Sequence, residues 1–198
     1  MRRTKAEALQ TREKILDTAL LLFDELGYSK TSLSAVAKQA GMTRGAIYWH
    51  FQNKEEILNA LAEREFAEII DKNSQALQAA NTWEQLTDNF VSFFGALNHH
   101  PQRARFFRIG YFQRGSDEAL ISLNRRMDSH WEEQCRRAVE QGHRNGELRP
   151  GVEPDYIFYH LSATISGLIK LYFEQSDRCR FERFAGPIIR NTIALFKR

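Results

Sequence analysis

Apolar residues recur every three or four positions along most of this chain, the spacing that places them on one face of an α-helix. The first clear stripe is followed by Gly27, and glycine commonly ends helices, so the pattern predicts a helix over about residues 11–26. The members of this stripe are Ile15, Ala19, Leu22, Phe23 and Leu26. Strand-like alternation does not occur in the sequence, so helices are expected throughout.

Two short helices separated by a sharp turn are predicted next. Either Thr31 or Ser32 is a suitable N-cap for the first, and Thr43 is suitable for the second, because their hydroxyls accept hydrogen bonds from the first turn. A longer fourth helix is expected over about residues 54–79.

Beyond residue 81 the predicted helices are longer and the connections between them are few. They are expected near residues 82–98, 102–113, 117–143, 154–175 and 180–197. Pro187 falls inside the last of these, so a kink or a later start is expected there. The fold class is therefore predicted to be all-α with about nine helices. We expect the chain to divide into a helix-turn-helix domain over residues 1–54 and a larger helical domain over residues 55–198.

The charge distribution adds a functional indication for the first domain. Residues 1–54 contain nine Lys and Arg against five Asp and Glu, a balance of +4, whereas the remainder has a balance of −1. Positive charge concentrated in one quarter of the chain indicates a polyanionic partner for that quarter.

Residues 32–51, SLSAVAKQAGMTRGAIYWHF, have the features that a DNA-reading helix-turn-helix requires. Two short helices that cross steeply need small residues at their contact, which Ala37 and Ala40 supply, and Gly41 permits the positive φ of the turn. The second helix then presents its N-terminal residues to the major groove. On this pattern alone, a three-helix cluster that does not bind DNA fits about equally well, because its aromatic residues also suit a core.

The longer string favours DNA binding. The stretch TRGAIYWHFQNKEEIL, preceded by TSLSAVAKQAG, closely resembles the TetR family of repressors and, within it, the multidrug-efflux repressors typified by AcrR. The resemblance is dense over residues 11–58, and a weaker match is ISGLIKLYF at residues 165–173. It implies a transcription repressor whose larger domain binds a ligand and forms a homodimer.

The resemblance also implies which residues meet DNA. The start of the second short helix would read bases, and Arg44 there is able to fork onto a guanine or to bind a phosphate. Residues at the end of that helix and around it would bind the sugar-phosphate backbone, which positions the protein without specifying sequence. The expected set is Thr31, Ser32, Thr43, Arg44, Gly45, Tyr48, Trp49, His50 and Lys54.

Apolar residues of the last two predicted helices suit a dimer interface. The resemblance implies that two helices from each protomer form a four-helix bundle about a two-fold axis. The alternative is that the same residues form the core of one protomer. The expected interface residues are Leu161, Ile165, Leu168, Tyr172, Phe184, Ile188 and Leu195.

Aromatic residues are dense in the middle of the chain. Their spacing alone favours plain core packing, whereas the resemblance implies that some of them line a ligand pocket, which is typically apolar with a few polar groups. The expected ligand-binding residues are Phe66, Phe90, Phe106, Trp131, Ser162 and Ser166, with Gln134 among further polar candidates.

The sequence gives no indication of an enzyme, a metal site or a cofactor. The histidines lack ligand spacing with a carboxylate or a cysteine, and no GxSxG, HExxH or phosphate-loop string occurs. The two cysteines, Cys135 and Cys179, do not form a CxxC pair, and the basic N-terminus lacks the apolar core of an export signal. We therefore expect a cytoplasmic protein that is not an enzyme.

These observations lead to one functional hypothesis with two alternatives. A dimer would bind a pseudo-palindromic operator and be released by a small hydrophobic or amphiphilic compound, and the resemblance implies control of an efflux pump gene. The first alternative is a DNA-binding protein of the same type without a small-molecule inducer. The second is a small helical enzyme, for which no catalytic constellation is present.

Overall fold

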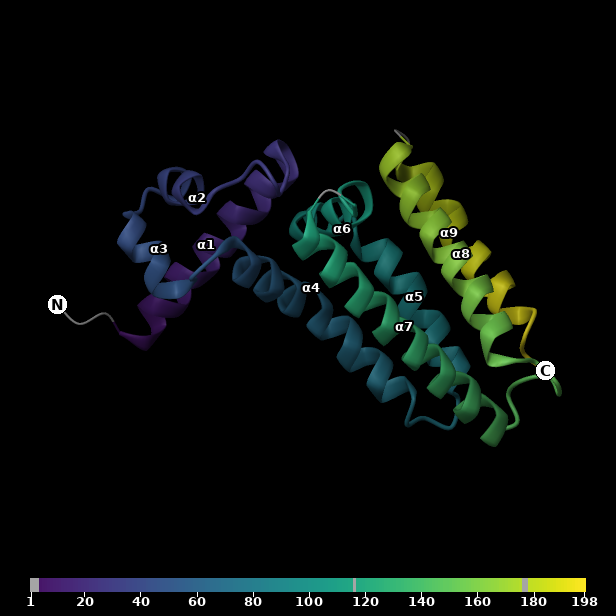
Figure 1. Ribbon diagram of the computed structural model, residues 1–198. Coiled ribbons are helices and arrows are strands. Elements are labelled where there is room, and N and C mark those ends of the chain that lie inside the picture. The colour runs from purple at the N-terminus through teal and green to yellow at the C-terminus, as the bar shows by residue number, and fades with distance from the viewer. Residues whose placement is uncertain (1–3, 116, 176–177) are drawn as a thin grey trace. The chain divides into compact units, whose positions relative to one another are not determined.

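In residues 4–115, 117–175 and 178–198, which the structure describes, this computed structural model contains nine α-helices and no strand (Figure 1). The predicted all-α fold with about nine helices is confirmed for these residues. The helices are α1 (Lys5–Leu26), α2 (Leu33–Ala40), α3 (Arg44–His50), α4 (Lys54–Ala76), α5 (Thr82–Ala96), α6 (Pro101–Phe112), α7 (Glu118–Arg144), α8 (Pro154–Glu174) and α9 (Arg178–Ala194).

Helix α1 begins six residues earlier than the apolar stripe predicted. Thr4 and Glu7 form a capping box, in which the Thr4 side chain accepts from the Glu7 backbone N–H and the Glu7 carboxylate accepts from the Thr4 backbone N–H. These polar contacts extend the helix beyond its buried face. The helix ends at Gly27, whose φ is 92°.

The two short helices and their turn follow the predicted caps closely. The Ser32 hydroxyl accepts from the Ala35 N–H, and the Thr43 hydroxyl accepts from the Ala46 N–H, both at 3.2 Å. Gly41 adopts the left-handed conformation, with φ 67° and ψ 36°, which a side chain would disfavour. These local interactions fix where α3 begins.

The chain forms two compact units. Unit 1 comprises residues 1–66 and 101–124, and unit 2 comprises residues 67–100 and 125–198. Helix α6 therefore packs with the first helices, although the sequence grouped it with the larger domain. The functional division after residue 54 remains a prediction.

In unit 1, charged side chains join α1 to α6 and to the first half of α4. The Asp24 carboxylate, 1% exposed, pairs with the guanidinium groups of Arg105 and Arg108 from α6. On α4, Arg64 lies 2.9 Å from Asp17 and 3.1 Å from Glu13. A buried carboxylate that has lost its water is stabilised by such pairing.

Unit 2 contains a second core, built by α5, α8 and α9 together with parts of α4 and α7. Helices α8 and α9 lie side by side (Figure 1). Trp83 is fully buried and donates its indole N–H to the Ala138 carbonyl at 3.1 Å. Helix α9 continues through Pro187, so the later start considered from the sequence is not observed. Among the described helices, none combines the length and apolar character that crossing a membrane requires.

Candidate DNA-reading interface and ligand cavity

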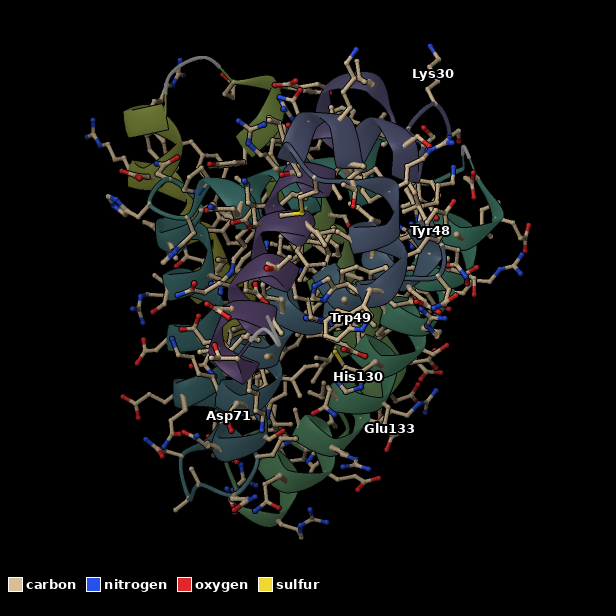
Figure 2. All side chains as sticks on the ribbon, turned by 90° about the vertical axis from the view of Figure 1, so that its left-hand side faces the viewer. Lys30, Tyr48, Trp49, Asp71, His130 and Glu133 are labelled. Carbon is tan, nitrogen blue, oxygen red and sulfur yellow. The ribbon has the colours of Figure 1, made fainter. Side chains whose placement is uncertain are left out.

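Helix α3 presents most of the predicted DNA-contacting residues at the surface of unit 1. Thr43, Arg44 and Gly45 at its start are exposed, as are Tyr48 and Trp49, the latter with 71% of its surface accessible. Figure 2 faces this side and shows Tyr48 and Trp49 at the surface on the α3 ribbon. Ile47 is completely buried and anchors the helix from the opposite side. Helix α3 therefore keeps one fully buried apolar anchor and exposes Arg44, Gly45, Tyr48 and Trp49, while His50 at its end is partly buried.

Ser34 contacts Arg44, an interaction that the sequence reasoning did not predict. Its hydroxyl oxygen accepts from Arg44 Nε at 2.7 Å and also from the Arg44 Nη2 group. Ser34 lies in the first turn of α2, ten residues before Arg44, and faces the start of α3. The sequence signal that could have indicated this contact is a polar residue in the first turn of α2, which faces Arg44 across the turn. The contact restricts the guanidinium before any partner arrives.

Thr31 does not fit its predicted role as a backbone contact to DNA. It is 3% exposed, and its hydroxyl donates to the Gly27 carbonyl at 2.9 Å and is 3.3 Å from the Leu22 carbonyl. This hydroxyl therefore satisfies the carbonyls at the end of α1. Ser32 is exposed beside it, so of the two residues only Ser32 remains available to a phosphate.

Lys54 lies at the start of α4, but its ammonium group has several intramolecular partners. It donates to the Tyr28 carbonyl at 3.1 Å and to the Ser29 carbonyl at 3.3 Å, and it lies 3.7 Å from the Asp117 carboxylate. It also lies 4.3 Å from the centroid of the Tyr28 ring. Burial raises the pKa of the Tyr28 hydroxyl above its ordinary value. Binding of a phosphate by Lys54 would compete with these contacts.

An open apolar groove of about 640 Å³ borders the end of α3. Leu9, 60% exposed, and Trp49 contribute large apolar surfaces, and Lys5 and Arg12 contribute positive charge. His50 completes the α3 side of this groove. The sequence predicted Trp49 and His50 as DNA contacts but did not indicate that Leu9 and Arg12 of α1 lie beside them. The arrangement combines apolar surface with cations, which suits the deoxyriboses and phosphates of a DNA strand.

Three of the six predicted ligand-binding residues come together in unit 2. The rings of Phe90 and Trp131 meet edge to face with centroids 5.5 Å apart, and the Trp131 indole N–H donates to the Ser162 hydroxyl at 2.8 Å. Phe90 and Trp131 line a cavity of about 10 Å³, which has room for about one water molecule. Its full lining is Asn73, Leu77, Trp83, Leu86, Phe90, Trp131, Gln134, Cys135, Ala138 and Leu161.

The other three of these six residues do not line this cavity, whereas Gln134, a further polar candidate, does. Phe66 and Phe106 form an aromatic cluster within unit 1, with centroids 5.7 Å apart and Phe107 against both. Ser166 is exposed on α8. The structure thus brings together Phe90, Trp131 and Ser162 within unit 2, whereas Phe66 and Phe106 pack within unit 1.

The predicted dimer residues divide into two sets. Leu161, Leu168 and Tyr172 are buried within the protomer, so the face of α8 that we assigned to a partner packs into its own core. Phe184, Ile188 and Leu195 are between 41% and 51% exposed and remain available, while Ile165 is partly exposed. Further exposed apolar residues on α8 are Tyr156, Tyr159 and Leu171.

Comparison with known proteins identifies the family. The model of the bacterial regulatory proteins of the tetR family matches residues 15–61. SrpR, an HTH-type transcriptional regulator of Pseudomonas putida, is 37% identical over 148 residues, which cover 71% of this chain and 67% of SrpR. The chain belongs to the TetR family.

Other TetR-family proteins match over nearly the whole length. The probable acrEF/envCD operon repressor of Escherichia coli (strain K12) is 28% identical over 199 residues, covering 98% of this chain and 90% of that protein. The structure of a SmeT–triclosan complex matches with a TM-score of 0.87 and 25% identity over 96% of this chain and 92% of SmeT. SmeT is the repressor of the multidrug efflux pump SmeDEF of Stenotrophomonas maltophilia.

Membership of the TetR family fits the geometry of unit 1. The matched residues 15–61 include α2, α3 and the start of α4, which together position the exposed recognition helix. The relatives regulate transcription, so this chain is a DNA-binding transcription regulator of the repressor type and not an enzyme. Among the described residues, no group of three or more His, Cys, Asp or Glu side chains is placed to hold a metal ion.

Proposed function

We propose that this protein is a homodimeric repressor that binds a pseudo-palindromic operator and is released by a small hydrophobic or amphiphilic compound. The observation that carries the DNA-binding part is the exposed start of α3, with Arg44 oriented by Ser34. The proposed site of action is the operator on chromosomal DNA in the cytoplasm. The proposed target gene encodes an efflux pump, because relatives such as SmeT repress such genes.

Base recognition is assigned to the start of α3. Arg44 forms the directional contact, with its guanidinium forked onto the O6 and N7 acceptors of a guanine. Thr43 and Tyr48 offer hydroxyl groups, and Gly45 permits close approach of the backbone. Ser32, Trp49 and His50 flank these residues and are assigned to the sugar-phosphate backbone, where they fix the register of α3 in the major groove.

Dimerisation is assigned to the exposed apolar side of α9 and the adjoining part of α8. Phe184, Ile188 and Leu195 would pack against the same residues of a second copy across a two-fold axis. In a two-fold dimer, the two recognition helices would bind half-sites about 34 Å apart, which is one turn of DNA. Because the two-fold axis relates the helices, the half-sites are expected to form a pseudo-palindrome.

Ligand release is assigned to the cavity lined by Phe90 and Trp131. A ligand shifts the equilibrium between operator-binding and released conformations only by binding one of them more tightly. Helix α4 is suited to transmit such a shift, because its residues up to 66 belong to unit 1 and those from 67 belong to unit 2. The structure of SmeT with triclosan supports a small aromatic inducer.

A second candidate is a repressor of the same type without a small-molecule inducer. The observation that favours it is the size of the cavity, about 10 Å³, which is far below the roughly 300 Å³ or more of ordinary ligand pockets. In this case α3 and the dimer face keep their roles, and the aromatic residues of unit 2 are only core.

Two measurements test these candidates. Footprinting on the promoter of the protein's own gene locates the operator, and fluorescence anisotropy then gives its affinity with and without saturating triclosan. We expect triclosan to weaken operator binding at least about 10-fold. An operator affinity that is unchanged at triclosan saturation supports the second candidate. If Arg44→Ala and Tyr48→Phe both bind the operator like the parent protein, the assignment of α3 as the reader is wrong.

A further inference from the structure

Gln134 has an unsatisfied buried acceptor beside the cavity of unit 2. Its side chain lines the cavity, and its Oε1 atom is buried without a hydrogen-bond donor among the described residues. Buried polar atoms in native proteins almost always have a partner, so an exception calls for an explanation. The amide of Gln134 sits on α7, three residues after Trp131, and therefore on the same side of the helix.

The neighbouring polar groups have partners of their own. The Trp131 indole N–H donates to Ser162, and the Trp83 indole N–H donates to the Ala138 carbonyl. The Asn73 side-chain oxygen accepts from Asn89 at 3.1 Å. These contacts commit both indole donors of the lining, so neither of them satisfies Gln134 Oε1.

The cavity lining contains no charged side chain. Its ten residues are apolar or aromatic apart from two amides, Asn73 and Gln134, and one thiol, Cys135. Burial raises the pKa of the Cys135 thiol to about 12, so this group is also neutral at physiological pH. A charged ligand placed here would lose its water without gaining an opposite charge, which is strongly unfavourable.

From these observations we infer that the cavity selects an uncharged aromatic compound with a hydrogen-bond donor, which donates to Gln134 Oε1 while its ring packs against Phe90 and Trp131. This inference rests on the ligand site of the proposed function and specifies the chemistry of the ligand. The donor supplies the partner that the acceptor lacks, and Gln134 is thereby the residue that determines specificity.

Entry of the ring requires the cavity to enlarge. Trp131 is partly exposed, and its indole N–H is held by the hydrogen bond to Ser162 on α8. Rotation of this side chain breaks that hydrogen bond and moves the indole ring away from Phe90, so that the ligand ring packs between the two. Ser162 therefore stabilises the closed form, and its removal favours the open one.

Three probes with closely related ring systems test the inference by isothermal titration calorimetry on the purified full chain. Indole carries the ring and the donor, 1-methylindole carries the ring without the donor, and indole-3-carboxylate adds a negative charge. We expect indole to bind at least about 10-fold more tightly than 1-methylindole, and indole-3-carboxylate to bind most weakly. Ser162→Ala should tighten the binding of indole and 1-methylindole by the same factor.

The substitution Gln134→Met removes the acceptor while keeping a flexible side chain of similar length. It should abolish the preference for indole over 1-methylindole and leave the binding of 1-methylindole at least as tight. Gln78→Met is the matched control, because Gln78 is exposed in the same unit and outside the cavity lining. This control should retain the preference, and thermal melts of both variants verify that they fold.

Three outcomes overturn the inference. The first is an indole preference that survives in Gln134→Met, the second is binding of none of the three probes, and the third is equal binding of indole and 1-methylindole by the parent protein. None of them affects the operator footprint or the response to triclosan, which test the proposed function separately.

Discussion

Arg44 and Ser34 are joined across the helix-turn-helix by a hydrogen bond of 2.7 Å from Nε to Oγ. The contact links the recognition helix to the helix before it and leaves Arg44 exposed. An arginine side chain loses considerable rotamer freedom when it binds a partner molecule. Because Ser34 already restricts Arg44 in the free protein, less rotamer freedom is lost on binding DNA.

The first prediction concerns this pair. Arg44→Ala should weaken operator binding by about 1–3 kcal/mol and relax the preference at one base pair. Ser34→Ala should weaken binding less, by a few-fold, without altering base preference, because only the orientation of Arg44 is lost. Anisotropy with operator variants measures both effects. Ser92→Ala, an exposed serine of α5, is the control and should bind as the parent does. A Ser34→Ala variant with full affinity would remove the orienting role.

The parts of the fold predicted correctly from sequence are those determined by neighbouring residues. Ser32 and Thr43 act as N-caps, and Gly41 has the positive φ that the turn requires. Each of these features depends on hydrogen bonds or sterics within a few residues. The start of α1 was placed too late because the Thr4–Glu7 capping box lies outside the apolar stripe.

The differences between the predicted sites and the structure arise from tertiary contacts. Lys54 donates to carbonyls 25 and 26 positions earlier in the chain, and Thr31 turns back onto the Gly27 carbonyl, contacts that helical spacing does not predict. On α8, periodicity identified an apolar stripe without indicating whether it faces the protomer or a partner. Leu161 and Leu168 turn out to face the protomer. Helical spacing contains no information on that choice.

The second prediction concerns the close approach of α7 to Trp83. A Cβ added to Gly142 would lie 2.3 Å from Trp83 Nε1, so Gly142→Ala must displace the indole and its hydrogen bond to Ala138. We expect a loss of at least about 2 kcal/mol in the free energy of unfolding, measured by urea denaturation. Gly95→Ala is the matched control, since nothing lies within 4 Å of its added Cβ and alanine favours helices. Equal stability of the two variants would contradict the packing described.

The third prediction concerns Cys135 and alkaline pH. Burial, reinforced by the charge of Glu132, raises the pKa of this thiol to about 12 in the folded protein, whereas the unfolded chain releases the proton near its ordinary value. The fold therefore favours the protonated form, so the stability that this provides is complete below about pH 9 and is lost as the pH rises toward 12. Melting temperatures between pH 8 and 11 should fall less steeply for Cys135→Val than for the parent. Parallel pH curves would show that the thiol does not contribute.

The fourth prediction concerns the dimer face on α9. Ile188 is 41% exposed, and replacing it by aspartate places a charge where the proposed partner packs. Ile188→Asp should therefore yield monomers in sedimentation velocity experiments and weaken binding to the full operator more than to a half-site. Ile70→Asp on α4, at similar exposure, is the control and should leave the association unchanged. If Ile188→Asp remains dimeric at micromolar concentration, the interface lies elsewhere.

The fifth prediction assigns the groove beside α3 to the DNA backbone. Lys5 lies at its rim with the apolar surfaces of Leu9 and Trp49. If a phosphate occupies this position, Lys5→Gln releases one counterion fewer on binding, so the slope of log affinity against log salt should fall by about 1. Trp49→Ala should weaken binding uniformly across operator sequences, because it loses contact with deoxyribose and not with bases. Lys72→Gln on α4 replaces an exposed lysine outside unit 1 and should leave the slope unchanged. A Lys5→Gln slope equal to that of the parent would show that DNA does not reach the groove, and the footprint would then end at α3.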